Sequence, residues 1–357
     1  GISISVLTNQ GLFKNAKAAQ NATEKAEKEQ GQRLNEYEDE INKYLNNANE
    51  DEKIGLITDN INKELSKTDN TKLKDEKGNR IVVPAGFKII NGATTVDKGI
   101  VIEDVTETAT KGSQFVWIPV GTITKSDGTT ATITLGRYDF DSTTGKESAY
   151  SGSYIEEDTN DASTLKKWGN TIAKNITKFK NSVATNGGYY IGRYEARTAT
   201  ARNAAGNALT QITEKGTENV YNYVTQLQAA QLSQNMYNSD KFTSDLMNSY
   251  AWDTATVFIQ NCGTNAKYSR QNSLNTSLLQ TGTNSLTDTS KIDVQCNIYD
   301  MASNILEWTT ETTDSSSFPC VYRGGFYGNS DHYTSCRDGN STSDSNVIVG
   351  FRPLLYL

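Results

Sequence analysis

The chain has 357 residues, which is enough for two or three domains or for one large domain with an appendage. Hydrophobic residues make up only 35% of it and Pro is scarce, so we expect long polar loops. The formal net charge is −7 and no stretch rich in Lys and Arg is interleaved with aromatic residues, which argues against nucleic acid as a partner.

The chain opens with GISISVL, an apolar fragment that no charged region precedes. We interpret it as the end of a longer apolar segment upstream of Gly1, which would anchor the protein in a membrane. No run of about 18 apolar residues occurs in the printed sequence. The expected location is extracellular, at the cell surface or on a pilus.

Residues 12–65 are rich in Ala, Glu, Lys, Gln and Asn and contain no Pro, a composition that favours helices. A first helix is predicted over residues 11–48, with an apolar stripe at three- and four-residue steps formed by Leu34, Tyr37, Ile41, Tyr44, Leu45 and Ala48. A second helix, capped by Asp51, is predicted over residues 51–65 from the same spacing of Ile54, Ile57, Ile61 and Leu65. The pair fits a helical hairpin, and a stalk helix without a partner is the alternative.

The run SKTDNTKLKDEKGN at residues 66–79 is polar and rich in turn formers, which predicts a linker or an exposed hairpin. We place the domain boundary there, with a helical stem and linker at residues 1–75 and a globular domain at residues 76–357. Short strands separated by Gly, Asp and Thr turns are predicted at 81–83, 87–90, 99–103, 115–120, 131–135 and 187–196. Helical patterns return at 163–185, 225–237 and 251–260, which indicates an α+β fold.

The four cysteines have none of the close spacing that zinc and redox sites show. An even number in a chain rich in Ser, Thr and Asn fits an exported protein with up to two disulfides. We favour a pair between Cys320 and Cys336. Buried thiols without disulfides are the alternative.

Six segments in the second part of the chain carry a family resemblance. They are FVWIPVG (115–121), YYIGRYEA (189–196), SYAWDTATVFI (249–259), NIYDMASNILEWTTE (297–311), YRGGFY (322–327) and GFRP (350–353). In this order they resemble the formylglycine-generating-enzyme or sulfatase-modifying-factor family, whose domain is a variant of the C-type lectin fold. The resemblance covers about residues 80–357 and implies an α+β, C-type lectin-like domain behind the helical stem.

The oxidases of this family use cysteines a few residues after the Gly-Gly pair, where a thiolate binds copper and exchanges with the substrate thiol. The corresponding positions here are Asn329 and Thr334, and Cys336 matches a structural cysteine instead. The sole histidine, His332, has no second soft ligand near it in the sequence. A shared fold does not imply a shared activity when the catalytic residues are missing, so we predict that the protein is not an enzyme.

One ligand set of the family is present in this chain. In the family the segment that ends in Glu-Trp can bind Ca²⁺ through two side chains and two main-chain carbonyls, an oxygen cage of the kind that Ca²⁺ prefers. The resemblance therefore implies side-chain ligation by Asp300 and Glu307, with Ser303 and Ile305 as carbonyl ligands. In the alternative, Glu307 only bonds a turn while Trp308 packs in the core.

The N-terminal stretch GLFKNAKAAQNATEKAEKEQ, which follows the apolar opening, resembles a different family. It is similar to the region after the transmembrane half of the first helix in type IV pilin-like proteins of Gram-positive bacteria. This resemblance covers only about residues 1–50. It implies contacts with other pilins through the helix, and a generic surface-anchor stalk is the alternative.

A restricted set of residue types marks the C-terminal stretch 326–349. Lys, Glu, Gln, Met and Trp are missing there, although Lys, Glu and Gln are frequent elsewhere. Every type present can be reached from the Asn codon AAC by changing adenines alone, and none of the five missing types can. The pattern resembles the targets of diversity-generating retroelements, which carry a variable region at the end of a lectin-type fold. We place the variable C-terminal region at residues 321–353; a long polar loop is the alternative.

A rigid scaffold that holds both ends of a loop lets its side chains vary without unfolding the domain. Tyr, Ser, Asn and Asp are also the residues of adaptable binding surfaces. Scaffold roles are predicted for Arg323, Gly324, Gly325, Gly350, Phe351 and Arg352. The candidate ligand contacts are Phe326, Tyr327, Asn329, Ser330, Asp331, His332, Tyr333, Thr334, Asp338, Asn340, Ser341, Thr342, Asp344 and Asn346.

These features together predict a surface-displayed, pilus-associated adhesin with a hypervariable C-terminal binding surface. Its ligand would be a protein or a glycan on a cell or phage surface. Two alternatives stay open. The first is an oxidase of the formylglycine-generating type, and the second is a structural minor pilin or phage receptor-binding component.

Overall fold

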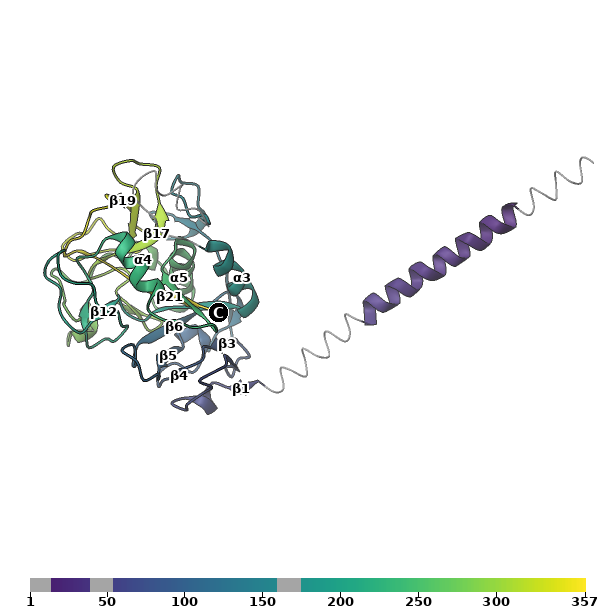
Figure 1. The fold of residues 1–357 in the computed structure, drawn as a ribbon, viewed down its shortest axis with the longest axis horizontal. Helices are drawn as coiled ribbons and strands as arrows, with labels where there is room; N and C mark the ends of the chain where they lie inside the picture. Colours follow the sequence, from purple (N-terminus) through teal and green to yellow (C-terminus); the bar gives the residue numbers. More distant parts are fainter. Residues whose placement is uncertain (1–13, 39–53, 159–174) are drawn as a thin grey trace, which may run out of the picture. The chain divides into compact units, whose positions relative to one another are not determined.

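The computed structural model describes residues 14–38, 54–158 and 175–357. The chain divides into two compact units, Gly1–Ile54 and Gly55–Leu357. Figure 1 shows the described helix of the first unit and the sheets and helices of the second. None of the helices in the described part of the chain combines the length and the apolar character that crossing a membrane requires.

The first unit contains the predicted stem helix, which is helical over residues 14–38. Its composition explains the conformation, and the pair of Lys25 and Glu29, one turn apart with 3.8 Å between Nζ and Oε1, adds to it. Leu34 and Tyr37 of the predicted apolar stripe are 60% and 63% exposed. The remaining stripe residues, from Ile41 to Ala48, lie outside the described residues.

The predicted second helix is wrong for the residues that the structure describes. Residues 55–65 contain β1 (Gly55–Leu56) and the 3-10 helix η1 (Thr58–Asn60), and β1 pairs with β2 (Thr71–Lys74). Ile57 is fully buried, and Ile61 forms a bridge with Ile89 of a neighbouring strand. The evenly spaced isoleucines therefore pack against strands and not along one helix face.

The predicted domain boundary at residue 75 is wrong for the same reason. Of the two predicted forms of residues 66–79, the structure shows a hairpin and not a linker, because β2 pairs antiparallel with β3 (Arg80–Val83) and continues the sheet that β1 begins. Residues 55–75 thus belong to the globular unit, which begins at Gly55.

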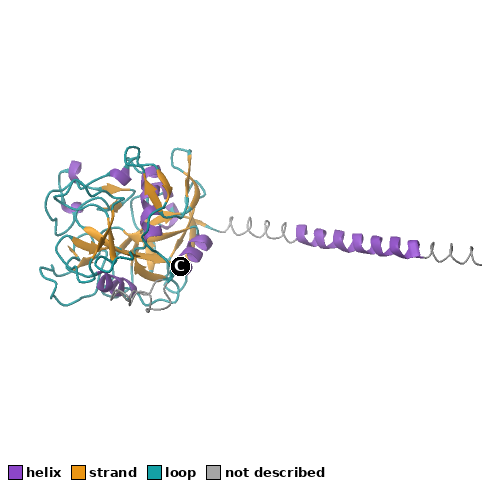
Figure 2. Ribbon diagram, turned by 90° about the horizontal axis from the view of Figure 1, so that it is seen from above, coloured by secondary structure: helices purple, strands orange, loops and turns teal. Residues whose placement is uncertain are grey.

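A six-stranded antiparallel sheet forms the centre of the globular unit. Its strand order is β14-β21-β11-β6-β5-β4. The strands are β4 (Phe87–Ile89), β5 (Val101–Asp104), β6 (Gln114–Pro119), β11 (Gly188–Gly192), β14 (Thr243–Leu246) and β21 (Pro353–Tyr356). Figure 2 shows strands in the interior of the unit, with helices and loops around them.

Both faces of this sheet are covered, which explains why β11 is buried along its whole length. Tyr189 and Tyr190 follow each other in β11 and therefore point to opposite faces. The Tyr189 hydroxyl donates to the carbonyl of Ala251 in a helix, at 2.7 Å. The Tyr190 hydroxyl donates to the carbonyl of Val82 in β3, at 3.0 Å. One face thus carries helices and the other carries the β1–β3 sheet.

Three helices of the globular unit lie where the sequence predicts them. They are α3 (Ile176–Asn186), α4 (Gln226–Gln234) and α5 (Ser249–Cys262). Each begins after a residue whose side chain accepts a hydrogen bond from the first turn: Asn175, Thr225 and Asn248. The earlier part of the predicted helix 163–185 lies outside the described residues.

A second, four-stranded sheet has the order β19-β18-β17-β20. It contains β17 (Leu306–Thr312), β18 (Cys320–Arg323), β19 (Arg337–Asn340) and β20 (Val349–Phe351). In Figure 1, β17 and β19 lie at the end of the globular unit away from β4 and β5. Arg352 alone separates β20 from β21 of the central sheet, so the C-terminal segment joins both sheets.

The remaining elements are short. Four two-stranded sheets pair β7 (Gly121–Thr124) with β8 (Thr130–Ile133), β9 (Tyr138–Phe140) with β10 (Glu147–Ala149), β12 (Arg197–Thr198) with β13 (Asn219–Val220), and β15 (Val294–Gln295) with β16 (Ile298–Tyr299). Further 3-10 helices are η2 (Val96–Lys98), η3 (Tyr268–Arg270), η4 (Thr283–Ser285) and η5 (Thr289–Lys291). The fold is α+β, as the sequence predicts.

Candidate ligand-binding surface

The N-terminal end of the candidate variable segment is held by Arg323 and the two glycines after it. Arg323 is fully buried; it forms an ion pair with Asp253 of α5, and its Nε donates to the carbonyl of Cys336 at 2.8 Å. A Cβ on Gly325 would lie 2.2 Å from the carbonyl oxygen of Ala302, and Gly324 has a φ of +89°. Other residues do not fit at these two positions, in agreement with their predicted scaffold role.

The C-terminal end is held by Gly350 and Arg352. A Cβ on Gly350 would lie 2.9 Å from the carbonyl oxygen of Tyr221. The fully buried guanidinium of Arg352 binds both carboxylate oxygens of Glu307 in β17, at 3.0 and 2.6 Å. Its Nη1 donates to the carbonyl of Gly192 in the central sheet, at 2.8 Å. The segment between these ends is therefore anchored on both sides.

Thr334, one of the predicted contacts, is fully buried and cannot touch a ligand at the surface. Its backbone N–H donates to the carbonyl of Gln271 at 2.9 Å, and its own carbonyl accepts from the Trp252 indole at 2.9 Å. The prediction for Thr334 is wrong because the backbone of the segment is buried at this point, between α5 and the loop that follows α5.

The other predicted contacts reach the surface to different extents. The exposed ones are Ser330, Asp331, Asp338 and Thr342. The half-buried ones are Phe326, Tyr327, Asn329, His332, Tyr333, Asn340, Ser341, Asp344 and Asn346. The surface is thus less exposed than its polar sequence suggests, because the segment folds back on itself and on the loop at 265–280.

Aromatic rings form a row from the surface into the core. The ring centroids of Tyr327 and Phe326 are 6.3 Å apart, and those of Phe326 and His332 are 5.1 Å apart. His332 is followed by Tyr322 at 6.4 Å, and Tyr322 by the fully buried Trp308 at 5.8 Å. Aromatic side chains held in this way offer contact area with little conformational freedom left to lose on binding.

A cluster of buried charged side chains contacts the segment through Arg337. Arg337 of β19 reaches Asp253 at 2.7 Å and Glu311 of β17 at 2.9 Å. Arg137 also pairs with Glu311, and Arg323 pairs with Asp253. Burial opposes the charge of Arg337, but the two carboxylates outweigh it and raise its pKa above the usual value. Sequence reasoning missed this cluster, because its members are far apart along the chain.

A recess of about 320 Å³ adjoins the segment at Asp338 and Gly339. Tyr154, Asp314 and Phe318 contribute to its wall, and the ring of Phe318 is 53% exposed. Burial together with the nearby charge of Asp338 raises the pKa of Tyr154 above its usual value. These lining residues lie outside the segment, so the residue-type pattern gave no signal for them.

The predicted disulfide between Cys320 and Cys336 is wrong, because all four cysteines are thiols. In the β18–β19 ladder, Cys320 lies opposite Asn340, whereas Cys336 precedes the residue that pairs with Arg323. Four residues separate Cys336 from Asn340 along the strand, so the two cysteines are offset by roughly 13 Å at the usual rise per residue. A disulfide needs Cα atoms within about 7 Å.

The predicted calcium ligands do not fit a calcium site. Arg352 occupies both carboxylate oxygens of Glu307. The carboxylate of Asp300 accepts from the hydroxyl of Thr283 and lies 3.8 Å from the guanidinium of Arg197. Two buried guanidinium groups beside the carboxylates would repel a cation. No cluster of three or more His, Cys, Asp or Glu side chains that could hold a metal occurs among the described residues.

Comparisons with known proteins give a structural likeness. No family model matches the chain. No curated protein matches it either. Among solved structures, Treponema denticola variable protein 1 aligns with 70% of this chain and 98% of its own, at 14% identity and a TM-score of 0.34.

Proposed function

We propose that this protein is a surface-displayed, pilus-associated adhesin whose C-type lectin-like domain presents a hypervariable ligand-binding surface at residues 326–349. One observation carries the proposal. The segment with the restricted, adenine-accessible residue set is also the segment whose two ends are locked by buried Gly and Arg residues. Diversification by a retroelement requires this combination, since the fold must survive any loop sequence.

The surface geometry supports binding by shape and hydrogen bonds. The row that starts at Tyr327 supplies aromatic area, and exposed polar side chains such as Ser330 and Asp331 surround it. Arg270 lies over the ring of Tyr333 at 3.8 Å and restricts it. A ligand of protein or glycan nature fits such a surface.

The oxidase alternative lacks support in the site. Asn329 and Thr334 occupy the positions of the family's cysteines, and Thr334 is buried. Burial raises the pKa of the nearby Cys336 thiol, which disfavours the thiolate that copper binding needs. No described residue therefore fills the catalytic role.

The stem belongs to the same proposal. A helix over residues 14–38 that follows an apolar opening fits a pilin-like stem, anchored in a membrane by a segment upstream of Gly1. The exposed Leu34 and Tyr37 are suited to contact other pilins. The domain would then be displayed outside the cell.

A population test needs no knowledge of the ligand. The 3′ end of the gene is sequenced from many cells of one culture and from related strains. We expect substitutions confined to the codons of residues 326–349, at the positions where a near-copy of this segment has adenine. We also expect a reverse transcriptase gene beside the gene. Substitutions spread evenly along residues 55–357 would contradict a diversified surface.

A binding test follows once a ligand is found on a glycan or cell-surface protein array. The triple variant Tyr327→Ala, Tyr333→Ala, Asn340→Ala should keep its melting temperature within a few degrees and lose binding, because an aromatic anchor contributes about 2 kcal/mol or more. The matched control is Leu34→Ala, Tyr37→Ala, which truncates exposed side chains of the stem. Unfolding of the triple variant, or unchanged binding, would count against the surface.

A further inference from the structure

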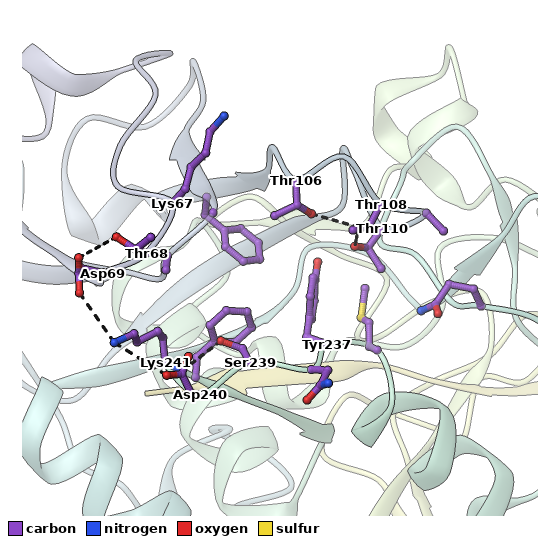
Figure 3. Close-up of a pocket in the computed structure, with 18 residues that line it drawn as sticks. Lys67, Thr68, Asp69, Thr106, Thr108, Thr110, Tyr237, Ser239, Asp240 and Lys241 are labelled. Carbon is purple, nitrogen blue, oxygen red and sulfur yellow. Dashed lines mark hydrogen bonds and ion pairs between the residues drawn. The ribbon is translucent and has the colours of Figure 1, made fainter.

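A recess formed by described residues lies apart from the variable segment. It has a volume of about 700 Å³, and none of its lining residues falls within 321–353. Strand β4, the loop after β5 and the connection from α4 to β14 form it (Figure 3). We call it the β4 recess. Its size is that of pockets which bind small molecules.

Aromatic side chains form the floor of the β4 recess. The ring of Phe87 in β4 lies 5.7 Å from that of Tyr237 and 5.7 Å from that of Phe242. Tyr237 and Phe242 are 5.4 Å apart. Phe87 and Phe242 are almost fully buried, and Met236 beside them is 4% exposed. The floor is thus apolar and rigid.

Threonine hydroxyls form one wall. The hydroxyls of Thr106 and Thr108 are 3.1 Å apart, and those of Thr108 and Thr110 are 2.8 Å apart. Behind them, the buried Asp104 accepts from Thr110 at 2.6 Å and from the Tyr237 hydroxyl at 3.1 Å. Figure 3 shows the Tyr237 hydroxyl directed at this wall. Since a hydroxyl can donate once and accept twice, the wall keeps capacity for a ligand's hydroxyl groups.

The charged groups at the rim are paired. Lys241 lies 3.8 Å from Asp69 and 4.0 Å from Asp240, and Lys67 lies 3.7 Å from Glu64. Neither an anion nor a cation therefore finds an uncompensated partner at the rim. The exposed Asn238 has no hydrogen bond to another described residue, so its amide is available to a neutral polar ligand.

We propose that the β4 recess binds a neutral saccharide ring. Such a ring has an apolar C–H face that suits the aromatic floor, and hydroxyl groups that suit the threonine wall and Asn238. The paired rim charges favour a ligand without net charge. This site is independent of the variable surface, so the protein would carry one constant and one variable binding site.

The test measures binding of defined probes to the whole protein by ligand-observed NMR and calorimetry. The probes are glucose, galactose and N-acetylglucosamine, with glucuronic acid and galactosamine as charged sugars and phenol as an apolar probe. The blocking variant is Ala109→Trp, at an exposed lining residue, and the matched control is Ala205→Trp, at an exposed turn. Thr108→Val removes one wall hydroxyl with little change in shape.

We expect saturable binding of at least one neutral sugar, at least tenfold weaker in Ala109→Trp and weaker in Thr108→Val, with Ala205→Trp unchanged. Melting curves establish that each variant is folded. If Ala109→Trp is unfolded, the affinity of Thr108→Val for the sugar tests whether the recess binds it. The triple alanine variant of the variable surface should keep this binding, which separates the two sites. The proposal is overturned if only phenol or the charged sugars bind, or if no probe binds. It is also overturned if the wild type and the folded recess variants bind the neutral sugars equally well.

Discussion

Arg337 shows how the environment of one side chain decides its role. By sequence it stands inside the candidate variable segment and is as accessible from an Asn codon as its neighbours. In the structure it binds Asp253 and Glu311, two fully buried carboxylates. Without it these carboxylates would lose a partner in the interior, where an unpaired charge is costly. Variation is therefore expected at exposed positions such as Asp331 and not at Arg337.

Asp293 leads to a pH prediction. Burial, and next the charge of Asp300, raise the pKa of Asp293 from 3.8 to about 7. Its carboxyl lies 3.0 Å from the Tyr268 hydroxyl and accepts from the Ala302 N–H at 3.0 Å. Between these two pKa values the folded state binds a proton that the unfolded state has lost. Protonation of Asp293 therefore favours the folded state. Its contribution to the free energy of unfolding is fully present below about pH 4 and is lost as the pH rises towards 7.

The variant Asp293→Asn should remove this contribution to the pH dependence. Urea unfolding between pH 4 and pH 7 would show a shallower fall in the free energy of unfolding for the variant than for the wild type. Asp331→Asn, at an exposed position, should behave as the wild type does. Equal slopes for Asp293→Asn and the wild type would contradict the prediction.

The β1–β3 sheet is the element that the sequence pattern misrepresents. Isoleucines at three- and four-residue steps fit a helix face, yet Ile57 is buried beside β2, where its N–H donates to the Lys74 carbonyl at 2.8 Å. The local spacing indicates only that these side chains are buried in the folded state. Whether a helix or a set of strands provides it depends on what packs against them.

Replacing Ile57 by Asp should therefore destabilise the globular unit. An unpaired carboxylate at a fully buried position is disfavoured by several kcal/mol, so the melting temperature of the domain should drop strongly. Lys63→Asp, at an exposed site nearby, should change the free energy of unfolding by no more than about 0.5 kcal/mol. If residues 55–65 were an independent stem helix, thermal unfolding of the domain would be the same in both variants.

At the scale of the whole molecule, Arg352 links the two sheets. It binds Glu307 in the four-stranded sheet and the Gly192 carbonyl in the central sheet. The ends of the variable segment are thus part of the connection that holds the domain together. Under the proposed diversification, the surface would vary while the link between the sheets stays constant.

The same link leads to a prediction about metals. Because an internal guanidinium already neutralises Glu307, the domain should not need calcium for stability. The melting temperature should be equal in EDTA and in millimolar CaCl₂, and a known calcium-dependent protein provides the control. A fall in EDTA that Ca²⁺ reverses and that Glu307→Gln abolishes would restore the calcium site implied by the family resemblance.

The sequence by itself determined the α+β class, the positions of α4, α5 and most strands of the central sheet, and the scaffold roles of Arg323 and Arg352. These follow from local periodicity, capping residues and motif order, which neighbouring residues carry. Only the tertiary structure decided the burial of Thr334, the thiol state of Cys320 and the β4 recess. Each of these depends on contacts between segments far apart in the chain, and local sequence patterns do not show which distant segments come into contact.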